Sequence, residues 1–266
     1  MPNVGLATLM TDFGTRDPYV AAMKGVILAG SPVARIVDIS HEIAPHDVLS
    51  GAFVWVQSAP YYPAGTVHVG VVDPGVGSDR KILVAACGQQ VFLFPDNGLI
   101  TFIAAAMPME GLAEVQNIKE LLGTDPSQTF HGRDIFAPIA AQLLNGMDLY
   151  ELGPEPESFT TLDIPDATAE DQGVAGEIIY VDHFGNLISN IPLRLLAERW
   201  EDGSGLTVTC GGKDAGPINA TYSAVPAGSP LSLFNSMGVL EIAVNRGSAA
   251  TVLGAQIGTE VRVAPR

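Results

Sequence analysis

The spacing of hydrophobic and polar positions changes near the middle of the chain. Up to residue 153, short apolar runs alternate with segments whose apolar residues recur at helical spacing. The short runs predict strands, and the segments with helical spacing predict helices. Strands are expected at 4–10, 34–39, 66–72, 81–87 and 91–94, and helices at 19–29, 48–58, 99–106 and 135–144. Asp17 is the expected N-cap of the first helix, with Pro18 at its first position, and Asp47 is the expected N-cap of the second. This alternation predicts an α/β fold with a mostly parallel sheet sandwiched by helices.

Beyond Gly153-Pro154 the chain contains many turn-forming residues. Residues 154–172 are rich in Pro, Asp, Glu and Thr and have weak periodicity, which is typical of a linker. Short strands follow at 176–181, 206–210, 231–233, 240–244 and 260–263, with one helix at 193–199. This pattern predicts a small C-terminal β-barrel or sandwich. The predicted division is an N-terminal α/β domain at 1–160, a linker at 161–172 and a C-terminal β domain at 173–266.

Composition narrows the class of protein. Of 266 residues, 47% are apolar and 16% charged, which is typical of a packed globular protein. The net charge of −16 argues against a nucleic-acid partner, because phosphate contacts need clustered Lys and Arg. No apolar run reaches the roughly 18 residues of a membrane span, and the N-terminus lacks the basic region of a signal peptide. Cys87 and Cys210 form no C-x-x-C pattern, so we expect free buried thiols and a cytoplasmic location.

Polar, glycine-rich segments follow three of the predicted strands. They are Asp12-Phe13-Gly14, the segment 73–77 and the segment 95–98. In open α/β sheets, ligands bind beyond the carboxyl ends of the strands. Each segment taken alone also fits an ordinary turn. Their convergence predicts a ligand site without naming its chemistry.

Familiar motifs of several enzyme classes are missing from the sequence. It contains no G-x-G-x-x-G, no P-loop, no G-x-S-x-G elbow and no H-E-x-x-H. His131 with Asp134, and His41 with His46, match no familiar zinc spacing. We therefore expect no metal and no cofactor.

Seven separated segments carry a more specific signal. Together, and in this order, they resemble the S-adenosyl-L-methionine (SAM) hydroxide adenosyltransferase family over nearly the whole chain. That family is similar to the fluorinases and chlorinases, which deliver a halide to the same carbon. The segments are MTDFGTRDPYVAAMKG, VDISHEIAPHDVLSGA, YYPAGTVHVGVVDPGVGSDR, FPDNGLIT, FHGRDIFAP, VDHFGNLISNI and NSMGVLEIAVNRG.

The resemblance implies a hydrolase that splits SAM into adenosine and L-methionine. It implies homotrimers, with each active site between the N-terminal domain of one subunit and the C-terminal domain of the next. By motif position, the Asp-Arg-His set of the family's hydrolases corresponds to Asp73, Arg80 and His131. These three side chains would hold one water behind the ribose C5′ carbon. The sequence leaves open whether Asp73 or His131 takes the proton of that water.

The resemblance also implies a set of substrate contacts. Asp12 matches the acceptor for the two ribose hydroxyls, and Asp182 matches the acceptor for the methionine ammonium. Asn186 matches the amide that reads adenine, and Phe184 is expected against the adenine face. Ser236 matches a contact to the methionine carboxylate, although the relatives often have Arg where Met237 stands.

Three other functions stay open at this point. A chlorinase-like enzyme would transfer a halide to the same carbon, and a non-catalytic sensor would bind an adenosyl ligand without releasing methionine. A metal-dependent hydrolase would lose activity in a strong chelator.

In the SAM hydrolase that the resemblance implies, the sulfonium leaves as a neutral thioether and needs no acid. The demand is therefore a nucleophile positioned in line with the C5′–S bond.

Overall fold

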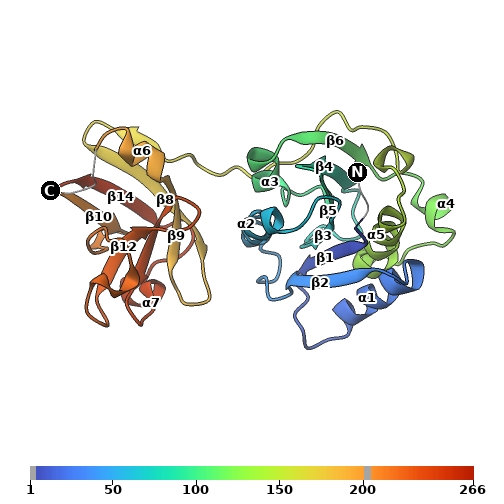
Figure 1. Ribbon diagram of the computed structural model, residues 1–266, viewed down its shortest axis with the longest axis horizontal. Helices are drawn as coiled ribbons and strands as arrows, with labels where there is room; N and C mark the ends of the chain where they lie inside the picture. Colours follow the sequence, from blue (N-terminus) through green and yellow to red (C-terminus); the bar gives the residue numbers. More distant parts are fainter. Residues whose placement is uncertain (1–3, 201–204) are drawn as a thin grey trace. The chain divides into compact units, whose positions relative to one another are not determined.

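A computed structural model describes residues 4–200 and 205–266 (Figure 1). The chain separates into two compact units, Met1–Leu162 and Asp163–Arg266. Each unit has its own hydrophobic core, so each is described by itself.

The first unit is built on a six-stranded sheet with the order β2-β1-β3-β5-β4-β6. Strands β2, β1, β3 and β5 are parallel, and β4 runs antiparallel to both β5 and β6. The mostly parallel sheet predicted from the sequence is confirmed. Strand β6 was not predicted, because only its Leu112 and Ala113 are buried and its apolar signal is short. The bounds are β1 Leu6–Thr11, β2 Arg35–Ser40, β3 Val67–Val71, β4 Ile82–Cys87, β5 Gln90–Pro95 and β6 Met109–Glu114.

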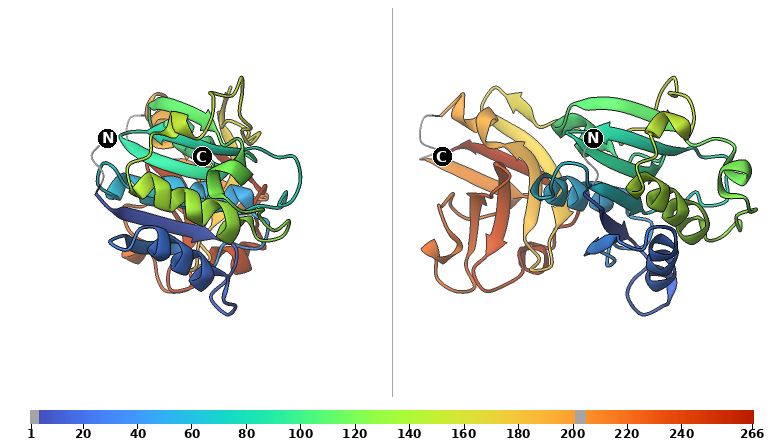
Figure 2. Two further views of the ribbon diagram at one scale, coloured as in Figure 1. Left: turned by 90° about the vertical axis from the view of Figure 1, so that its right-hand side faces the viewer. Right: turned by 45° about the vertical axis from the view of Figure 1, so that its right-hand side comes forward.

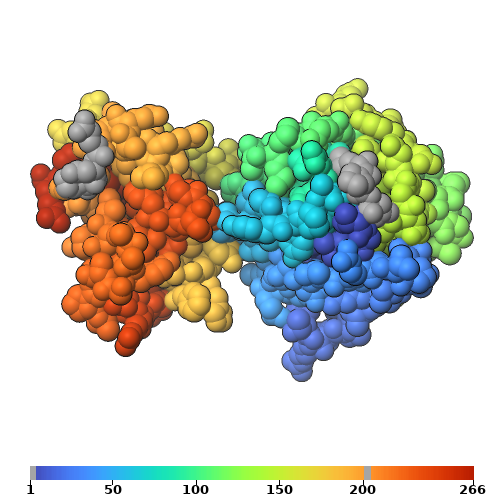
Figure 3. All heavy atoms as spheres, viewed as in Figure 1, coloured from blue at the N-terminus to red at the C-terminus, as the bar shows by residue number. Residues whose placement is uncertain are grey.

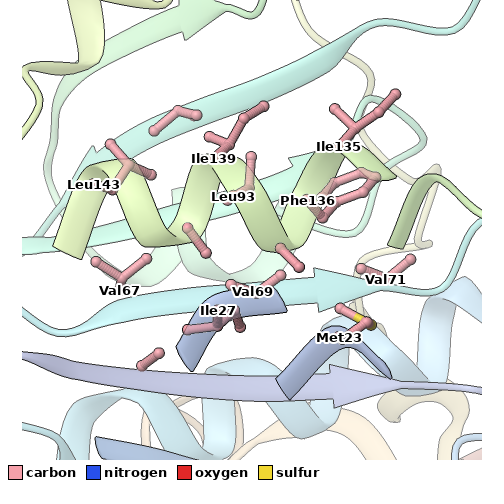
Figure 4. Packing of buried hydrophobic residues seen from close by; sticks show 14 of the residues in the cluster. Met23, Ile27, Val67, Val69, Val71, Leu93, Ile135, Phe136, Ile139 and Leu143 are labelled. Atoms are coloured by element: carbon pink, nitrogen blue, oxygen red, sulfur yellow. The ribbon is translucent and has the colours of Figure 1, made fainter. Parts of the chain in front are cut away.

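Helices cover both faces of this sheet (Figures 1 and 2). Helices α1 (Tyr19–Gly30) and α5 (Ala137–Leu144) pack on one face, where Ile139 and Leu143 of α5 share a hydrophobic cluster with side chains of β3 and β5 (Figure 4). Helices α2 (Val48–Ser58) and α3 (Thr101–Ala106) enclose a second cluster on the other face. The surface around α1 and β2, blue in the space-filling view, is formed by early residues of the chain (Figure 3). Shorter elements are α4 Ile118–Leu122, a π-helical turn at Gly132–Phe136 and 3-10 turns at Ala59–Tyr61 and Leu149–Glu151.

The helix starts test two predictions about capping. Asp47 caps α2 as expected, since its side chain accepts from the backbone N–H of Ser50. The expected cap of α1 at Asp17 is wrong. Pro18 occupies the cap position with φ −77° and ψ 4°, so the helix begins one residue later, at Tyr19, with no side-chain cap.

The second unit is an antiparallel sheet of eight strands that curls into a barrel-like fold. Seven strands follow the order β11-β10-β14-β8-β9-β13-β12, and β7 pairs with β8. The segment after β11 bridges back to β12 through Ile218 and Ser232, which nearly closes the barrel. The bounds are β7 Thr168–Glu170, β8 Gly173–Val181, β9 Leu187–Pro192, β10 Leu206–Cys210, β11 Lys213–Asp214, β12 Pro230–Phe234, β13 Val239–Val244, β14 Glu260–Pro265, α6 Leu193–Ala197, α7 Ala249–Leu253 and a 3-10 turn at Tyr222–Ala224.

The barrel-like C-terminal fold is therefore confirmed. Strand β9 was not predicted, because Ser189 and Asn190 interrupt its apolar pattern. Their side chains are used inside the sheet: Ser189 donates to the carbonyl of Leu240, and Asn190 accepts from the backbone of Glu177. Cys87 and Cys210 are buried and free, as expected.

Candidate active site

Sheet topology brings Asp73 and Arg80 to the same edge. Asp73 follows β3, and Arg80 precedes β4. Because β4 runs antiparallel to β5, its first residue, Ile82, pairs with Pro95 at the end of β5. The start of β4 therefore lies where the parallel strands end, which is the edge at which open α/β sheets bind ligands.

Arg80 and Asp73 form a nearly buried ion pair. The Nε atom of Arg80 lies 2.8 Å from Oδ1 and 2.9 Å from Oδ2 of Asp73, and Nη2 also donates to Oδ2. The side chains are only 9% and 4% exposed, respectively. Turns at Gly75 and Ser78 return the chain, since Ser78 Oγ donates to the carbonyl of Gly75 and accepts from the N–H of Arg80. The DPGVGSDR segment thus folds back on its own first residue.

His131 completes the cluster from a distant part of the sequence. Its Nδ1 atom lies 2.8 Å from Nη2 of Arg80. The residue stands directly before the π-helical turn Gly132–Phe136, a feature frequent at functional sites. Burial, and then the charge of Arg80, lower the pKa of the His131 imidazole, although Asp73 and Asp134 act in the opposite direction. The net shift favours the neutral form of His131.

The His131 segment lies close against the turn before β4 and is braced by contacts of its own. Gly77 adopts φ +79°, and a Cβ atom there would stand 2.5 Å from the carbonyl oxygen of Gln128. Only glycine allows this close approach. Within the His131 segment, Asp134 accepts from the N–H of Ser127 at 3.0 Å and pairs with Arg133.

Asp12 stands on the loop that follows β1. Its Oδ2 atom accepts from the N–H of His46 at 2.9 Å, which leaves Oδ1 without a hydrogen bond from this contact. Next to it, Thr11 contacts the buried His41, and Gly14 donates to the His41 carbonyl at 2.7 Å. The loop is thus fixed by the segment that follows β2.

These residues surround a cavity of about 610 Å³ in the first unit. The predicted residues Asp12, Asp73 and His131 line it, and Arg80, which does not line it, contacts both Asp73 and His131. The structure therefore brings the three predicted catalytic side chains together. The lining is Asp12, Phe13, Tyr19, Pro45, His46, Val71, Asp73, Val76, Ser127, Thr129, Phe130, His131, Gly132 and Arg133.

A second cavity of about 550 Å³ lies within the barrel-like unit. It brings together the predicted residues Asp182, Phe184 and Asn186. Oxygen Oδ1 of Asp182 accepts from the N–H groups of Phe184 and Asn186, and Oδ2 accepts from the Asn186 amide at 2.9 Å. Phe184 is 73% exposed. The lining is Asp182, Phe184, Asn186, Tyr222, Val244, Arg246 and Gly247.

Ser236 does not line this second cavity. It is an exposed residue of the turn between β12 and β13. The turn is held by Asn235, whose side chain also reaches Glu241, the partner of the lining residue Tyr222.

The sequence patterns did not single out Tyr222, which lines this cavity, or its partner Glu241. Tyr222 stands in a long irregular connection, and Glu241 reads as an outward-facing position of a strand. A carboxylate within an otherwise apolar strand, LEIAV, was the available signal.

Among residues 4–200 and 205–266, no three His, Cys, Asp or Glu side chains come close enough together to hold a metal ion. In the same part of the chain, every helix is too short or too polar to cross a bilayer.

Comparisons with known families cover most of the chain. The N-terminal domain of SAM hydroxide adenosyltransferase matches residues 7–153, and the C-terminal domain of that family matches residues 176–262. A curated relative from Salinispora tropica, named (R)-S-adenosyl-L-methionine hydrolase, is 39% identical over 264 residues, or 95% of each chain. A relative of the same name from Thermus thermophilus is 39% identical over 96% of this chain and 97% of its own length.

More distant relatives and a solved structure agree with this match. A fluorinase from Actinoplanes sp. is 28% identical over 97% of both chains. The crystal structure of a conserved protein from Thermotoga maritima is 36% identical, with a TM-score of 0.89, covering 97% of this chain and 99% of that one.

Proposed function

This chain belongs to the SAM hydroxide adenosyltransferase family, and from this premise we propose that it hydrolyses S-adenosyl-L-methionine to adenosine and L-methionine. The observation that carries the proposal is the cluster of Asp73, Arg80 and His131 at the wall of the first cavity. Attack occurs at the ribose C5′ carbon, with water as the nucleophile. The halide-transferring relatives are the more distant ones, at 28% identity against 39%.

The contacts of Arg80 support different roles for Asp73 and His131. A guanidinium only donates hydrogen bonds, so Nδ1 of His131 carries a lone pair and the imidazole proton is on Nε2. His131 therefore donates from Nε2 to the water oxygen, which orients the water without deprotonating it. Arg80 places no more than one donor, Nε, on Oδ1 of Asp73, so that oxygen keeps a lone pair for the proton of the water. Asp73 is the proposed general base.

The reaction balances with these groups alone. A lone pair of the water oxygen forms the new bond to C5′, and the C5′–S bond breaks with its electron pair moving to sulfur. The sulfonium becomes the neutral thioether of methionine, and one water proton passes through Asp73 to solvent. Arg80 stabilises the hydroxide character that develops on the water through its contacts with Asp73 and His131.

Asp12 is the proposed acceptor for the ribose hydroxyls, since it lines the cavity and keeps acceptor capacity beyond its bond to His46. Asp182, Phe184 and Asn186 are the proposed contacts of the methionine ammonium and the adenine, which their common cavity supports. Ser236 remains the proposed carboxylate contact.

The cavity of the first unit is lined by residues with proposed roles at the water and the ribose, and the cavity of the second unit by the proposed contacts of the methionine ammonium and the adenine. We keep the proposal that the protein is a homotrimer, with the N-terminal domain of one subunit meeting the C-terminal domain of the next. Mixing Arg80→Ala and Asn186→Ala subunits tests it: re-assembled trimers regain part of the activity that each variant lacks alone. Light scattering that gives a monomer, or mixtures that stay inactive, would contradict it. The proposed cytoplasmic location fits the two free thiols.

Hydrolysis in H₂¹⁸O with a strong chelator tests the reaction itself. We expect adenosine and methionine in equal amounts, with one ¹⁸O in the adenosine. Label-free adenosine would remove water as the nucleophile, and dependence on a metal would overturn the proposed metal-independent chemistry. Binding without methionine release would favour a sensor, and a chlorinated nucleoside formed in added chloride would favour halide transfer.

The stereochemistry at sulfur is a separate question. The two hydrolases at 39% identity are named for the (R) epimer of SAM. We propose the same preference here. Separated (R) and (S) epimers, assayed at equal concentration, should give faster turnover of the (R) form.

A further inference from the structure

A buried carboxylate that the reaction does not use lies beside the second cavity. Glu241, on β13, is only 4% exposed. The hydroxyl of Tyr222 donates to its Oε1 at 2.6 Å, and the amide of Asn235 donates to its Oε2 at 3.3 Å. Burying a carboxylate costs free energy unless both oxygens are hydrogen-bonded, and an apolar residue would fill the site at lower cost.

One partner of Glu241 forms part of the cavity wall. Tyr222 lines the second cavity with Phe184 and Asn186, and 46% of the residue is exposed. It stands in a 3-10 turn of three residues, between the two-residue strand β11 and strand β12. Because so little regular structure supports the ring, the hydrogen bond to Glu241 is a major constraint on its position.

The other partner holds the turn that carries Ser236. Oxygen Oδ1 of Asn235 accepts from the N–H of Met237 at 3.0 Å, and its backbone carbonyl accepts from Gly238. With Oδ1 used in this way, the Asn235 side chain presents its amide nitrogen to Glu241. One carboxylate thus joins the aromatic wall to the turn.

Burial shifts the ionisation of both Tyr222 and Glu241 towards their protonated forms. Burial and then the bond to Glu241 raise the pKa of the Tyr222 hydroxyl, which keeps the proton on tyrosine. Burial raises the pKa of Glu241 as well, and the nearby Asp182 acts in the same direction on both groups.

We propose that Glu241 is a positioning residue that holds the Tyr222 ring against the nucleoside end of the substrate and ties this ring to the Asn235–Gly238 turn. The inference rests on the proposed function, because it takes the adenosyl group as the ligand of this cavity. It assigns a binding role to two residues, neither of which contributes to the reaction at C5′.

Three variants and a control test this role. Tyr222→Phe removes only the hydroxyl, and Glu241→Leu removes the acceptor. We expect each to raise the Kd for adenosine and the KM for SAM about tenfold, the scale of one hydrogen bond, with kcat changed less than about twofold. Glu241→Gln keeps an acceptor for Tyr222 and should recover most of the affinity. Ser232 lies on the neighbouring strand β12, and Ser232→Ala, which removes a buried hydrogen bond to the Ala215 carbonyl, should leave the Kd unchanged.

The outcomes separate the two proposals. If wild-type protein hydrolyses SAM while Tyr222→Phe binds adenosine as wild type does, the positioning role is overturned. The same holds if Ser232→Ala weakens binding as much as Glu241→Leu, since the effect would then be general destabilisation. If Glu241→Leu fails to fold, Tyr222→Phe still decides the question. Wild-type protein that neither binds adenosine nor releases methionine overturns the proposed function itself.

Discussion

The Oγ1 atom of Thr11 lies 2.9 Å from Nδ1 of His41, and both side chains are almost fully buried. Thr11 also accepts from the N–H of Phe13 at 3.2 Å. With its oxygen accepting from this backbone group, the hydroxyl proton of Thr11 is available to His41. On the other side of the imidazole, Oδ1 of Asp38 lies 3.0 Å from Nε2 of His41. Asp38 also pairs with Lys24. This chain of contacts fixes the backbone on both sides of Asp12.

The first prediction concerns this support. Thr11→Val keeps the shape of the side chain but removes the hydroxyl, which leaves Nδ1 of His41 and the N–H of Phe13 without this partner. We expect a loss of about 1–3 kcal/mol in the free energy of unfolding and a several-fold rise in the Kd for adenosine. Denaturant unfolding and calorimetry measure the two effects. Thr11→Ser should restore both, and a serine variant as weak as the valine variant would contradict the hydrogen-bond explanation.

The second prediction concerns the ribose. Asp12→Ala removes the proposed acceptor for the two ribose hydroxyls, so the affinity for adenosine should fall at least tenfold. The affinity for 2′,3′-dideoxyadenosine, which lacks both hydroxyls, should change little in the same variant. Calorimetry with both nucleosides gives the comparison. An equal loss for the two ligands would mean that Asp12 shapes the cavity without contacting the ribose.

The third prediction concerns the charge behind the proposed water site. Arg80→Ala leaves Asp73 and His131 without their shared partner, and it should lower kcat a hundredfold or more while adenosine still binds. Arg80→Lys keeps the charge but cannot contact both residues as the planar guanidinium does, so it should recover only part of the rate. Wild-type turnover by Arg80→Ala would remove Arg80 from the mechanism.

The sequence predicted those parts of the protein that local patterns determine. Asp73 and Arg80 lie seven positions apart in one turn-rich segment, so their meeting follows from a reversal that Pro74, Gly75 and Gly77 already indicate. Apolar runs predicted the central strands, and Asp47 predicted the start of α2. His131 lies 51 positions after Arg80, and no local pattern links the two residues. It was predicted only from the order of the motifs along the chain.

Other features depend on contacts that only the folded chain reveals. Arg80 is not among the residues that line the cavity, and its guanidinium contacts both Asp73 and His131, which the sequence alone does not reveal. The π-helical turn after His131 has no known sequence signal here. Glu241 alternates in a strand as a surface residue would, and its burial depends on Tyr222 from another segment.

The fourth prediction concerns pH. An ordinary imidazole has a pKa of 6.5, and burial with the charge of Arg80 lowers that of His131. A lowered pKa favours the neutral form in the folded protein, so its stabilising effect is present above the ordinary value and is lost as pH falls through the lowered one. The proposed role needs this neutral form, because a protonated Nδ1 could not accept from Arg80.

Activity should therefore persist below the pH at which an exposed histidine becomes charged. The acid limb of kcat/KM is expected below pH 6.5, and it should change in His131→Gln, whose amide does not titrate. The pH profiles of wild type and His131→Gln, both measured with SAM, provide the test. Ionisation of the substrate affects the two proteins equally, so any difference reports on the enzyme. A wild-type acid limb above pH 6.5 that disappears in His131→Gln would show that the imidazole is charged in the ordinary range, and the assignment of a neutral, water-orienting His131 would then be wrong.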